Sequence, residues 1–302
     1  MDEILKLTIY AKVDQLMTSD GMQCLLVTAD DGEKYNLKSE NMLEDIFVGC
    51  IYEFEIAKYL NSEKNNGYIT KYMHITEIED TLKLNDIYRK FIDGAKLDYS
   101  KLKAGIEEYI NKIDNKVLYD ITSTIINSYE HDFYLYPAAS KLHHAYVGGL
   151  AYHTFGMLGM VDGLCNSFPY LDKNLLYAGC ILHDIGKVIE FSGVEKTEYT
   201  VKGQLLGHLL MGCNIVELVA DDMGYRDTEE VLMLTHMIAS HHGVTQFGAI
   251  RKPATAEAAM LWYIDSIDSK FRVLGEELEK TKPGQFTEPV GVMDRVKFYK
   301  HK

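Results

Sequence analysis

The first 80 residues carry short apolar runs separated by polar turn signals. The runs read KLTIYAKV, MQCLLVTAD, IYEFEIAKYL and GYITKYMHIT, and the turn signals are the pairs Asp20-Gly21, Asp31-Gly32 and Asn66-Gly67. Short runs bounded by such pairs are typical of β-strands joined in hairpins. The pattern predicts a small antiparallel β domain in the form of a five-stranded barrel.

From about residue 84 the apolar positions recur every three or four residues, as expected for helices. In the segment 99–133 these positions include Leu102, Ile106, Tyr109, Ile110, Ile113 and Val117. Helical periodicity continues to about residue 280. The last 20 residues contain two prolines and are expected to form an extended tail on the surface. The predicted fold class is multidomain and mainly α, with the β domain first in the chain.

Length and composition favour a globular protein of two domains. The chain has 302 residues, of which 47% are hydrophobic. No window approaches the ~18–20 continuous apolar residues of a membrane span, and the opening MDEILKLTIY is acidic where a signal peptide would be basic. The five cysteines are scattered without a C-x-x-C spacing, so neither a disulfide framework nor a thiolate zinc site is expected. We therefore expect a soluble, cytoplasmic protein with no membrane partner.

The net charge of −14 argues against broad, charge-driven binding to nucleic acid or anionic membranes. The first 80 residues hold seven lysines and 16 acidic residues, and so carry −9 of that charge. A local basic groove remains compatible with this balance. Divalent ions bound in an active site would offset part of it.

Histidines gather in the helical part of the chain. Nine of the eleven lie between residues 131 and 242, most of them inside apolar runs. The positions of chemical interest are His153, the pair His183-Asp184, His208, the pair His241-His242, and Asp265 with Asp268. The last two are three residues apart, so they share one face of their predicted helix.

Each of these positions alone has an ordinary explanation. A single histidine on an apolar helix face is more often a hydrogen-bonded core residue than a ligand, and two aspartates on a helix are often solvated. Burying five such groups separately would be costly, whereas one metal centre explains them together. Imidazoles and carboxylates without thiolates suit borderline or hard divalent ions, and six or seven ligands are too many for one tetrahedral ion. The sequence therefore predicts two metal ions, with Asp184 placed to bridge them.

Two residues that follow the His183-Asp184 pair extend this interpretation. Gly186 breaks the helix and would let another stretch of backbone approach the site. Lys187 could direct a fixed positive charge to a substrate phosphate. A lysine at a helix end also has a purely structural use, because it interacts favourably with the helix dipole.

The order of these motifs resembles the HD-domain phosphohydrolase superfamily. His153, the doublet in LHDIGK and a distal aspartate match its basic pattern, and His208 and His241-His242 resemble its two-metal branch. The longer segments YPAASKLHHAYVGGLAYHTFGML, DKNLLYAGCILHDIGKVIEFSG, GQLLGHLLMG, HMIASHHG and KPGQFTEPVGVMDRVKFYK resemble the YhaM-type 3'-to-5' exoribonucleases of Firmicutes. That family joins an N-terminal OB-fold to an HD domain. The resemblance implies an OB-like β domain over 1–80, a helical connector over 81–131, an HD domain over 132–272 and a tail over 273–302 that packs on the HD domain.

The resemblance also implies roles for individual residues. Asp184 and Lys187 are the expected catalytic residues, and Asp268 would lie behind the metal ligands. The implied ligands are His153, His183, Asp184, His208, His241 or His242, and Asp265. Lys187 resembles the lysine of the family motif that contacts phosphate, and Asp268 is a further expected substrate contact. His143 and His144 are expected to contact substrate only because they lie ten and nine residues before His153. The alternative phosphate contacts are Arg251, Lys252, Arg295, Lys297 and Lys300. Manganese is the preferred ion, with iron, zinc, cobalt and magnesium as alternatives.

The function implied is a metal-dependent exonuclease that shortens RNA, and also single-stranded DNA, from the 3' end and releases 5'-mononucleotides. The expected partners are single-stranded RNA or short oligonucleotides, and a homo-oligomer is left open. The alternatives are hydrolysis of a small nucleotide such as a cyclic dinucleotide or a nucleoside triphosphate, a di-iron oxygenase, and a non-catalytic binding module. The aromatic residues of the β domain could stack on bases, but their alternation is more typical of a core.

Overall fold

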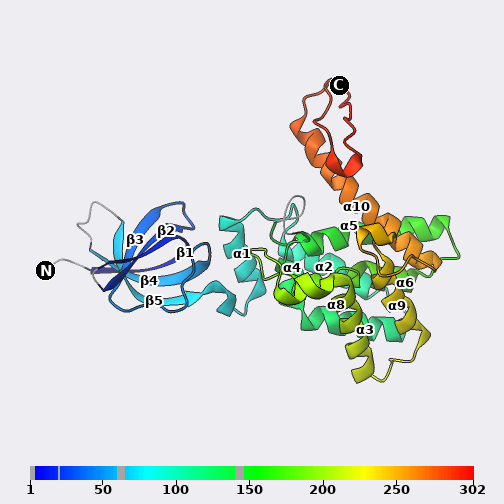
Figure 1. The fold of residues 1–302 in the computed structure, drawn as a ribbon, viewed down its shortest axis with the longest axis horizontal. Coiled ribbons are helices and arrows are strands. Elements are labelled where there is room, and N and C mark those ends of the chain that lie inside the picture. Colours follow the sequence, from blue (N-terminus) through cyan, green and yellow to red (C-terminus); the bar gives the residue numbers. More distant parts are fainter. Residues whose placement is uncertain (1–3, 20, 60–64, 140–145) are drawn as a thin grey trace. The chain divides into compact units, whose positions relative to one another are not determined.

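The computed structural model describes residues 4–19, 21–59, 65–139 and 146–302. Its internal contacts divide the chain into two compact units. The first unit comprises Met1–Gly94 and Gly193–Lys196, and the second comprises Ala95–Ser192 and Thr197–Lys302. The first unit is built mainly from strands and the second from helices (Figure 1).

Five strands close the first unit into a barrel in the order β1-β2-β3-β5-β4 (Figure 1). The strands are β1 (Ile4–Ser19), β2 (Met22–Ala29), β3 (Lys34–Ser39), β4 (Ile51–Tyr59) and β5 (Asn66–His74). Neighbouring strands are antiparallel except for β3 and β5, which run parallel. The predicted N-terminal barrel is confirmed, with one parallel pair that an all-antiparallel domain would lack. A short 3-10 helix, η1 (Ile75–Glu77), and α1 (Thr81–Phe91) complete the unit.

The turn predicted at Asn66-Gly67 is wrong, because both residues belong to β5. Asn66 pairs with Asn36 and Gly67 pairs with Leu37 in the parallel ladder. A Cβ added at Gly67 would lie 3.4 Å from the carbonyl oxygen of Ala57 and 3.4 Å from a methyl group of Leu37. The glycine thus serves close packing inside the barrel wall, rather than a turn.

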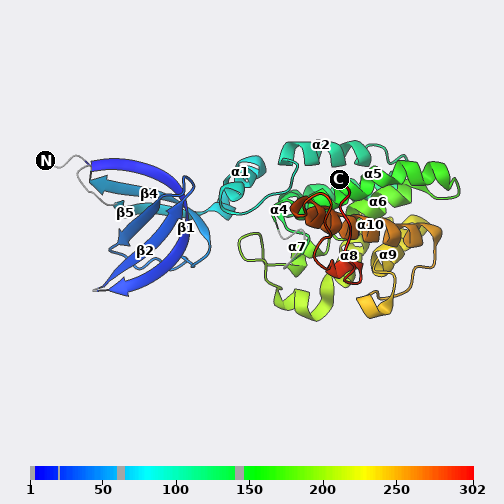
Figure 2. The same ribbon diagram turned by 90° about the horizontal axis from the view of Figure 1, so that it is seen from above.

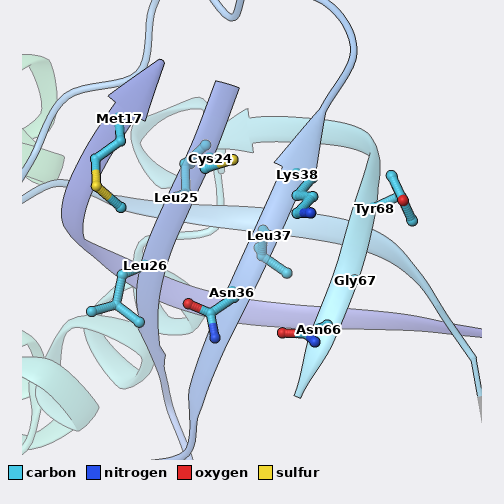
Figure 3. Close-up of a pocket in the computed structure, with 10 residues that line it drawn as sticks. All are labelled: Met17, Cys24, Leu25, Leu26, Asn36, Leu37, Lys38, Asn66, Gly67 and Tyr68. Carbon is cyan, nitrogen blue, oxygen red and sulfur yellow. The ribbon is translucent and has the colours of Figure 1, made fainter. Parts of the chain in front are cut away.

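Three aromatic residues of the barrel belong to its core. The side chains of Tyr52 and Phe54 are fully buried, and that of Tyr35 is nearly so. Tyr68 differs from them, because it is 42% exposed and lines a groove of about 510 Å³ on β2, β3 and β5 (Figure 3). The other residues that line this groove are Met17, Cys24, Leu25, Leu26, Asn36, Leu37, Lys38, Asn66 and Gly67.

The second unit is a helical bundle around one large apolar core. Its helices are α2 (Tyr99–Ile110), α3 (Lys116–Ser128), α4 (Glu130–Leu135), α5 (Gly149–Ser167), α6 (Lys173–Leu182), α7 (Lys187–Glu190), α8 (Val201–Asp222), α9 (Glu229–Ser240) and α10 (Ala256–Lys280), with short 3-10 turns η2 (Thr245–Phe247) and η3 (Gly291–Met293). α10 packs against α5, α6 and α9 (Figure 2). Buried aliphatic side chains such as Leu176, Leu234 and Leu261 fill the space between them. The helical prediction for this part of the chain is confirmed.

One helix among the described residues, α8, is long and apolar enough by composition to cross a membrane. Its most apolar window is 44% buried inside the fold, and the helix packs against α3, α7 and α9. The core helix of a soluble protein passes the same test, so a single such helix is weak evidence for a membrane span.

The residues that follow α10 fold back in a hairpin instead of forming an extended tail (Figure 1). Bridges join Phe286 to Tyr299 and Val290 to Val296. Val290 packs with Val273 and Leu274 of α10 in a small apolar cluster. Local pairing and this cluster fix the segment on the last turns of α10, which composition alone does not reveal.

Candidate metal centre

His183 and Asp184 lie in the turn between α6 and α7. Asp172 begins α6 by accepting hydrogen bonds from the backbone N–H groups of Asn174 and Leu175, and the helix ends at Leu182. A Cβ at Gly186 would overlap the carbonyl oxygen of His208, so only glycine lets α8 come this close. The expectation that Gly186 allows close backbone approach is confirmed.

Four further elements bring polar side chains to the same turn. α5 carries His153, and α10 carries Asp265 one turn before Asp268. His241 ends α9 and His242 follows it. The sharp turn after this pair needs glycine at position 243, where φ is +74° and any Cβ would overlap the ring of Trp262.

His208 follows a break in α8. Gly207 has φ of 72° and ψ of 157°, a conformation that side chains other than glycine rarely adopt. The break takes the backbone N–H of His208 out of the regular helical pattern. That N–H donates to Oε1 of Glu190 at 3.0 Å, and Nδ1 of the same histidine lies 3.0 Å from Oε2.

Seven side chains converge in this region, and we call them the ligand cluster: His153, His183, Asp184, His208, His241, His242 and Asp265. On one side, Nε2 of His183 lies 3.2 Å from Oδ2 of Asp184. Nε2 of His153 lies 3.2 Å from Oδ1 of Asp265. The ring centroids of His153 and His183 are 5.3 Å apart. His153, His183 and Asp184 each offer a ligand atom within 4.8 Å of the other two.

The other side of the ligand cluster is formed around Oδ1 of Asp184. This oxygen lies 3.5 Å from Nε2 of His208 and 3.6 Å from Nε2 of His241. Nε2 of His242 lies 3.3 Å from Nε2 of His208. The ligand atoms of the three histidines are within 4.8 Å of one another. Asp184 therefore faces both groups of histidines, one with each carboxylate oxygen.

The burial of the ligand cluster fits a bound cation. His183 is fully buried, and Asp184 and His153 are each 4% exposed. Nε2 of His183 and Oδ1 of Asp184 are buried without a hydrogen-bond partner among the described residues. Leaving such atoms unsatisfied costs about 1–3 kcal/mol each. A divalent ion would satisfy both, and the donor set of imidazoles and carboxylates suits ions such as Mn²⁺, Fe²⁺ or Zn²⁺.

Contacts of the Nδ1 atoms orient three imidazoles of the ligand cluster so that their Nε2 atoms face its centre. Nδ1 of His183 donates to the carbonyl of Cys180 at 2.9 Å, and Nδ1 of His241 donates to that of Ile238 at 2.8 Å. Nδ1 of His153 lies 2.8 Å from Oδ2 of Asp268. A proton on Nδ1 leaves the lone pair of Nε2 for the centre of the cluster.

Glu190 is a residue of this site that sequence reasoning missed. Its side chain is almost fully buried, and it holds His208 through both the backbone and the ring. The available signal was a carboxylate inside the apolar stretch KVIEF. Arg272 was also missed: its Nε donates to Oδ2 of Asp268 at 2.7 Å, and its guanidinium lies over the ring of Tyr152.

Charges inside the site shift the pKa of several groups. Burial opposes ionisation of Asp184, but the nearby charges of Lys187 and His183 prevail and hold the pKa of its carboxyl well below the ordinary value. Burial lowers the pKa of His153, but Asp265 and Asp268 outweigh it and raise that pKa to about 9. Burial lowers the pKa of His241, which is therefore ready to act as a neutral ligand.

Lys187 contacts the ligand cluster directly. Its Nζ donates to Oδ2 of Asp184 at 2.6 Å and to the carbonyl oxygen of Ala138 at 2.8 Å. The side chain is only 15% exposed. Lys187 therefore provides a fixed positive charge beside Asp184, and its contact with a phosphate stays a prediction.

The remaining predicted substrate contacts are not part of this arrangement. Arg251 and Lys252 are exposed between η2 and α10, and no hydrogen bond or ion pair joins them to the ligand cluster within the described part of the chain. Arg295, Lys297 and Lys300 belong to the C-terminal hairpin, where Nζ of Lys300 donates to the carbonyl of Leu278. His143 and His144 lie outside the described residues.

Comparison with known families agrees with this geometry. The family model for the HD domain matches residues 150–270, a range that contains every member of the ligand cluster. No solved structure matches the chain significantly. HD domains bind divalent metals, and the cluster supplies the histidines and aspartates for this. The chain therefore contains an HD domain, downstream of a five-stranded barrel, and this domain indicates a metal-dependent phosphohydrolase.

Proposed function

We propose that this protein is a 3'-to-5' exoribonuclease that hydrolyses phosphodiesters and releases 5'-mononucleotides, with single-stranded DNA as a second substrate. The observation that carries the proposal is the position of Asp184 between two groups of histidines. Such a shared carboxylate supports a site for two ions, which is the usual arrangement for phosphodiester hydrolysis. The sequence resemblance to YhaM-type enzymes supports RNA as the substrate.

The residues fit two neighbouring ions. His153, His183, Asp184 and Asp265 would hold the first, and Asp184, His208, His241 and His242 would hold the second. When bound, two divalent ions supply positive charge that activates water and stabilises the departing oxygen. We propose manganese as the native ion, and iron, zinc, cobalt and magnesium as the alternatives that metal analysis would reveal.

The chain's own residues position these groups. Lys187 neutralises part of the negative charge of Asp184 and would add its positive charge to the binding of a phosphate at the ligand cluster. Asp268, itself held by Arg272, fixes the ring of His153. Glu190 fixes His208 in the same way on the other side. These contacts reduce the reorganisation that binding and reaction would otherwise require.

The groove on the barrel supports single-stranded RNA as the partner. The face of strands 2 and 3 is where OB-type barrels bind oligonucleotides. Here that face carries an exposed aromatic ring, Tyr68, beside the positive charge of Lys38, its neighbour in the parallel ladder (Figure 3). Asn36 and Asn66 add hydrogen-bonding groups. A base could stack on Tyr68 while Lys38 contacts a phosphate.

The acidity of the barrel favours a second candidate, in which the HD domain hydrolyses a small nucleotide and the barrel binds no nucleic acid. The first 80 residues carry a net charge of −9, which repels a polyanion outside the groove. A small nucleotide would need only the ligand cluster and Lys187. The cytoplasm is the proposed compartment for either activity.

Product analysis separates the two candidates. RNA oligomers labelled at the 5' end should give a ladder that shortens by one nucleotide at a time, while a 3' label should appear at once in a mononucleotide. Asp184→Asn should abolish the ladder, whereas Asp294→Asn, an exposed acid in the C-terminal hairpin, should leave it unchanged. Intact oligomers together with hydrolysis of a cyclic dinucleotide would contradict the exonuclease and support the second candidate. Assays without oxygen should give the same rates, since hydrolysis consumes none.

A further inference from the structure

A second set of potential metal ligands belongs to the first unit. Cys50 directly precedes β4, His74 is the last residue of β5, and Glu195 lies in the segment Gly193–Lys196. Each offers one ligand atom within 4.8 Å of the other two. All three are half-buried. The three residues are far apart in sequence, so no spacing rule would have joined them.

Glu195 is held with its carboxylate directed at this group. Its Oε1 accepts a hydrogen bond from the backbone N–H of Ile51 at 2.9 Å. Its Oε2 lies 3.2 Å from Nε2 of His74, and the side chain is only 9% exposed. The carboxylate thus has one oxygen engaged with the backbone and the other directed at the ring of His74, where a cation would lie between the two groups.

His74 is positioned by contacts on its other ring nitrogen. Nδ1 accepts a hydrogen bond from the backbone N–H of Thr76 at 3.3 Å and lies 2.7 Å from the hydroxyl oxygen of the same residue. The ring also packs edge-on against Tyr52, with centroids 4.8 Å apart. Because Nδ1 accepts a hydrogen bond, the neutral ring carries its proton on Nε2, beside Oε2 of Glu195. A metal ion bound at Nε2 would move this proton to Nδ1, where the hydroxyl oxygen of Thr76 can accept a hydrogen bond.

Cys50 brings a sulfur atom to the same point. Its carbonyl accepts from the N–H of Val13 at 3.0 Å, and its own N–H donates to the carbonyl of Phe47 at 3.3 Å, so its backbone is fixed. Burial and the adjacent Glu195 raise the pKa of the thiol to about 11, in spite of Lys196 and Lys12 nearby. Without a cation this sulfur is therefore a neutral thiol, and binding of a metal would release its proton.

We propose that Cys50, His74 and Glu195 form a binding site for a divalent cation of the zinc type. One sulfur, one imidazole nitrogen and one carboxylate oxygen make a donor set that favours Zn²⁺ or Co²⁺ over Mg²⁺ or Ca²⁺. Three protein ligands leave a fourth position for water. The ion would join the start of β4, the end of β5 and the segment Gly193–Lys196 within the first unit. The site is independent of the exonuclease proposed above.

Cobalt spectroscopy on the full chain tests this site without interference from the HD domain. Thiolate bound to Co²⁺ gives an intense charge-transfer absorption, and the ligand cluster contains no cysteine. The wild-type protein should show this absorption with an intensity that corresponds to one thiolate-bound ion per chain, whatever further Co²⁺ the ligand cluster takes up. Cys50→Ser should abolish it, and Glu195→Gln should weaken it. Cys24→Ser is the matched control, because Cys24 is a half-buried cysteine of the same barrel and should have no effect. Asp184→Asn should keep the absorption.

Alkylation of the wild-type protein gives a second measurement that needs no variant. Zinc should slow the modification of Cys50 by ~tenfold or more and leave the rate at Cys24 unchanged, because a metal-bound thiolate is shielded. Addition of a chelator should restore the rate. A wild-type spectrum without the thiolate absorption, an absorption that survives Cys50→Ser, or equal alkylation of Cys50 with and without zinc would overturn the proposal.

Discussion

Replacement of Gly186 by alanine tests how the fold positions His208. Gly186 has ordinary helical dihedral angles, with φ of −60°, so alanine introduces no backbone strain there. The added Cβ would lie 2.0 Å from the carbonyl oxygen of His208 and 2.8 Å from the amide nitrogen of Gly212. Both are backbone atoms of α8, so no side chain can rotate out of the way.

The size of the effect follows from these distances. Non-bonded heavy atoms pack best at about 3.5 Å or more, so α8 must move away by at least about 1 Å. Overpacking of this kind costs about 1–3 kcal/mol in the free energy of unfolding. Because the clash is between two backbone segments that cannot yield easily, we expect a cost at the upper end of this range. In a domain of this size 1 kcal/mol corresponds to about 2–4 °C, so the melting temperature should fall by about 6–12 °C. The same movement displaces His208, so metal content should fall from two ions toward one.

Differential scanning calorimetry and elemental analysis measure the two effects on the same samples. Gly159→Ala is the matched control, because Gly159 is an exposed helical residue of α5 with no atom within 4 Å of an added Cβ. That variant should be stabilised by about 0.5–1 kcal/mol, since alanine favours the helix. A Gly186→Ala protein with the melting temperature and metal content of the wild type would refute the argument that the close backbone approach at this turn positions His208.

Three further predictions concern the site and the groove. Glu190→Gln should lower the affinity for the second ion by about 10–100-fold, because His208 loses the charged partner of its Nδ1. The pKa of His153 is about 9 in the metal-free protein, so metal binding at pH 7 should release a proton from its ring. The affinity for the first metal ion should therefore rise about tenfold per pH unit between pH 7 and 9 and stay constant at higher pH. Tyr68→Ala should raise KM for long oligonucleotides by about 5–150-fold, which corresponds to the loss of one stacked base, and leave dinucleotides unaffected.

Each of these predictions has its own control. Glu217→Gln changes a carboxylate of α8, the helix that carries His208, but this carboxylate contacts Thr235 instead of the ligand cluster. This variant should bind metal normally, and equal affinities for both variants would contradict the role of Glu190. Titration calorimetry in buffers of different ionisation enthalpy counts the released proton, and a value of zero at pH 7 would contradict a protonated His153. Tyr170→Ala removes a ring that is 72% exposed in the second unit, and an equal rise in KM there would argue against the groove.

Local patterns were sufficient to predict the two kinds of unit and the chemistry of the candidate site. Strand-like runs predicted the barrel, and three-to-four periodicity predicted the bundle. The chemical types of the donors were also visible, since a histidine or aspartate inside an apolar run is conspicuous. These signals are local because hydrophobic periodicity reports on the nearest turns of the chain.

Tertiary structure decided how these elements are used. It made Asn66-Gly67 part of a parallel strand pair, because the closing of the barrel outweighs a local turn preference. It also folded the C-terminal residues into a hairpin on α10 through the cluster around Val290. Neither result follows from spacing, since each depends on contacts between residues that are distant in sequence.

The same reason explains what the sequence could and could not say about the site. The sequence by itself determined which donors exist and that Asp184 stands beside His183. Only the folded chain placed Glu190 behind His208, paired Lys187 with Asp184, and brought Cys50 to His74 and Glu195. Hydrogen bonds and metal ligands act over about 2–4 Å, so a site is defined by packing in space, which a pattern along the chain does not contain.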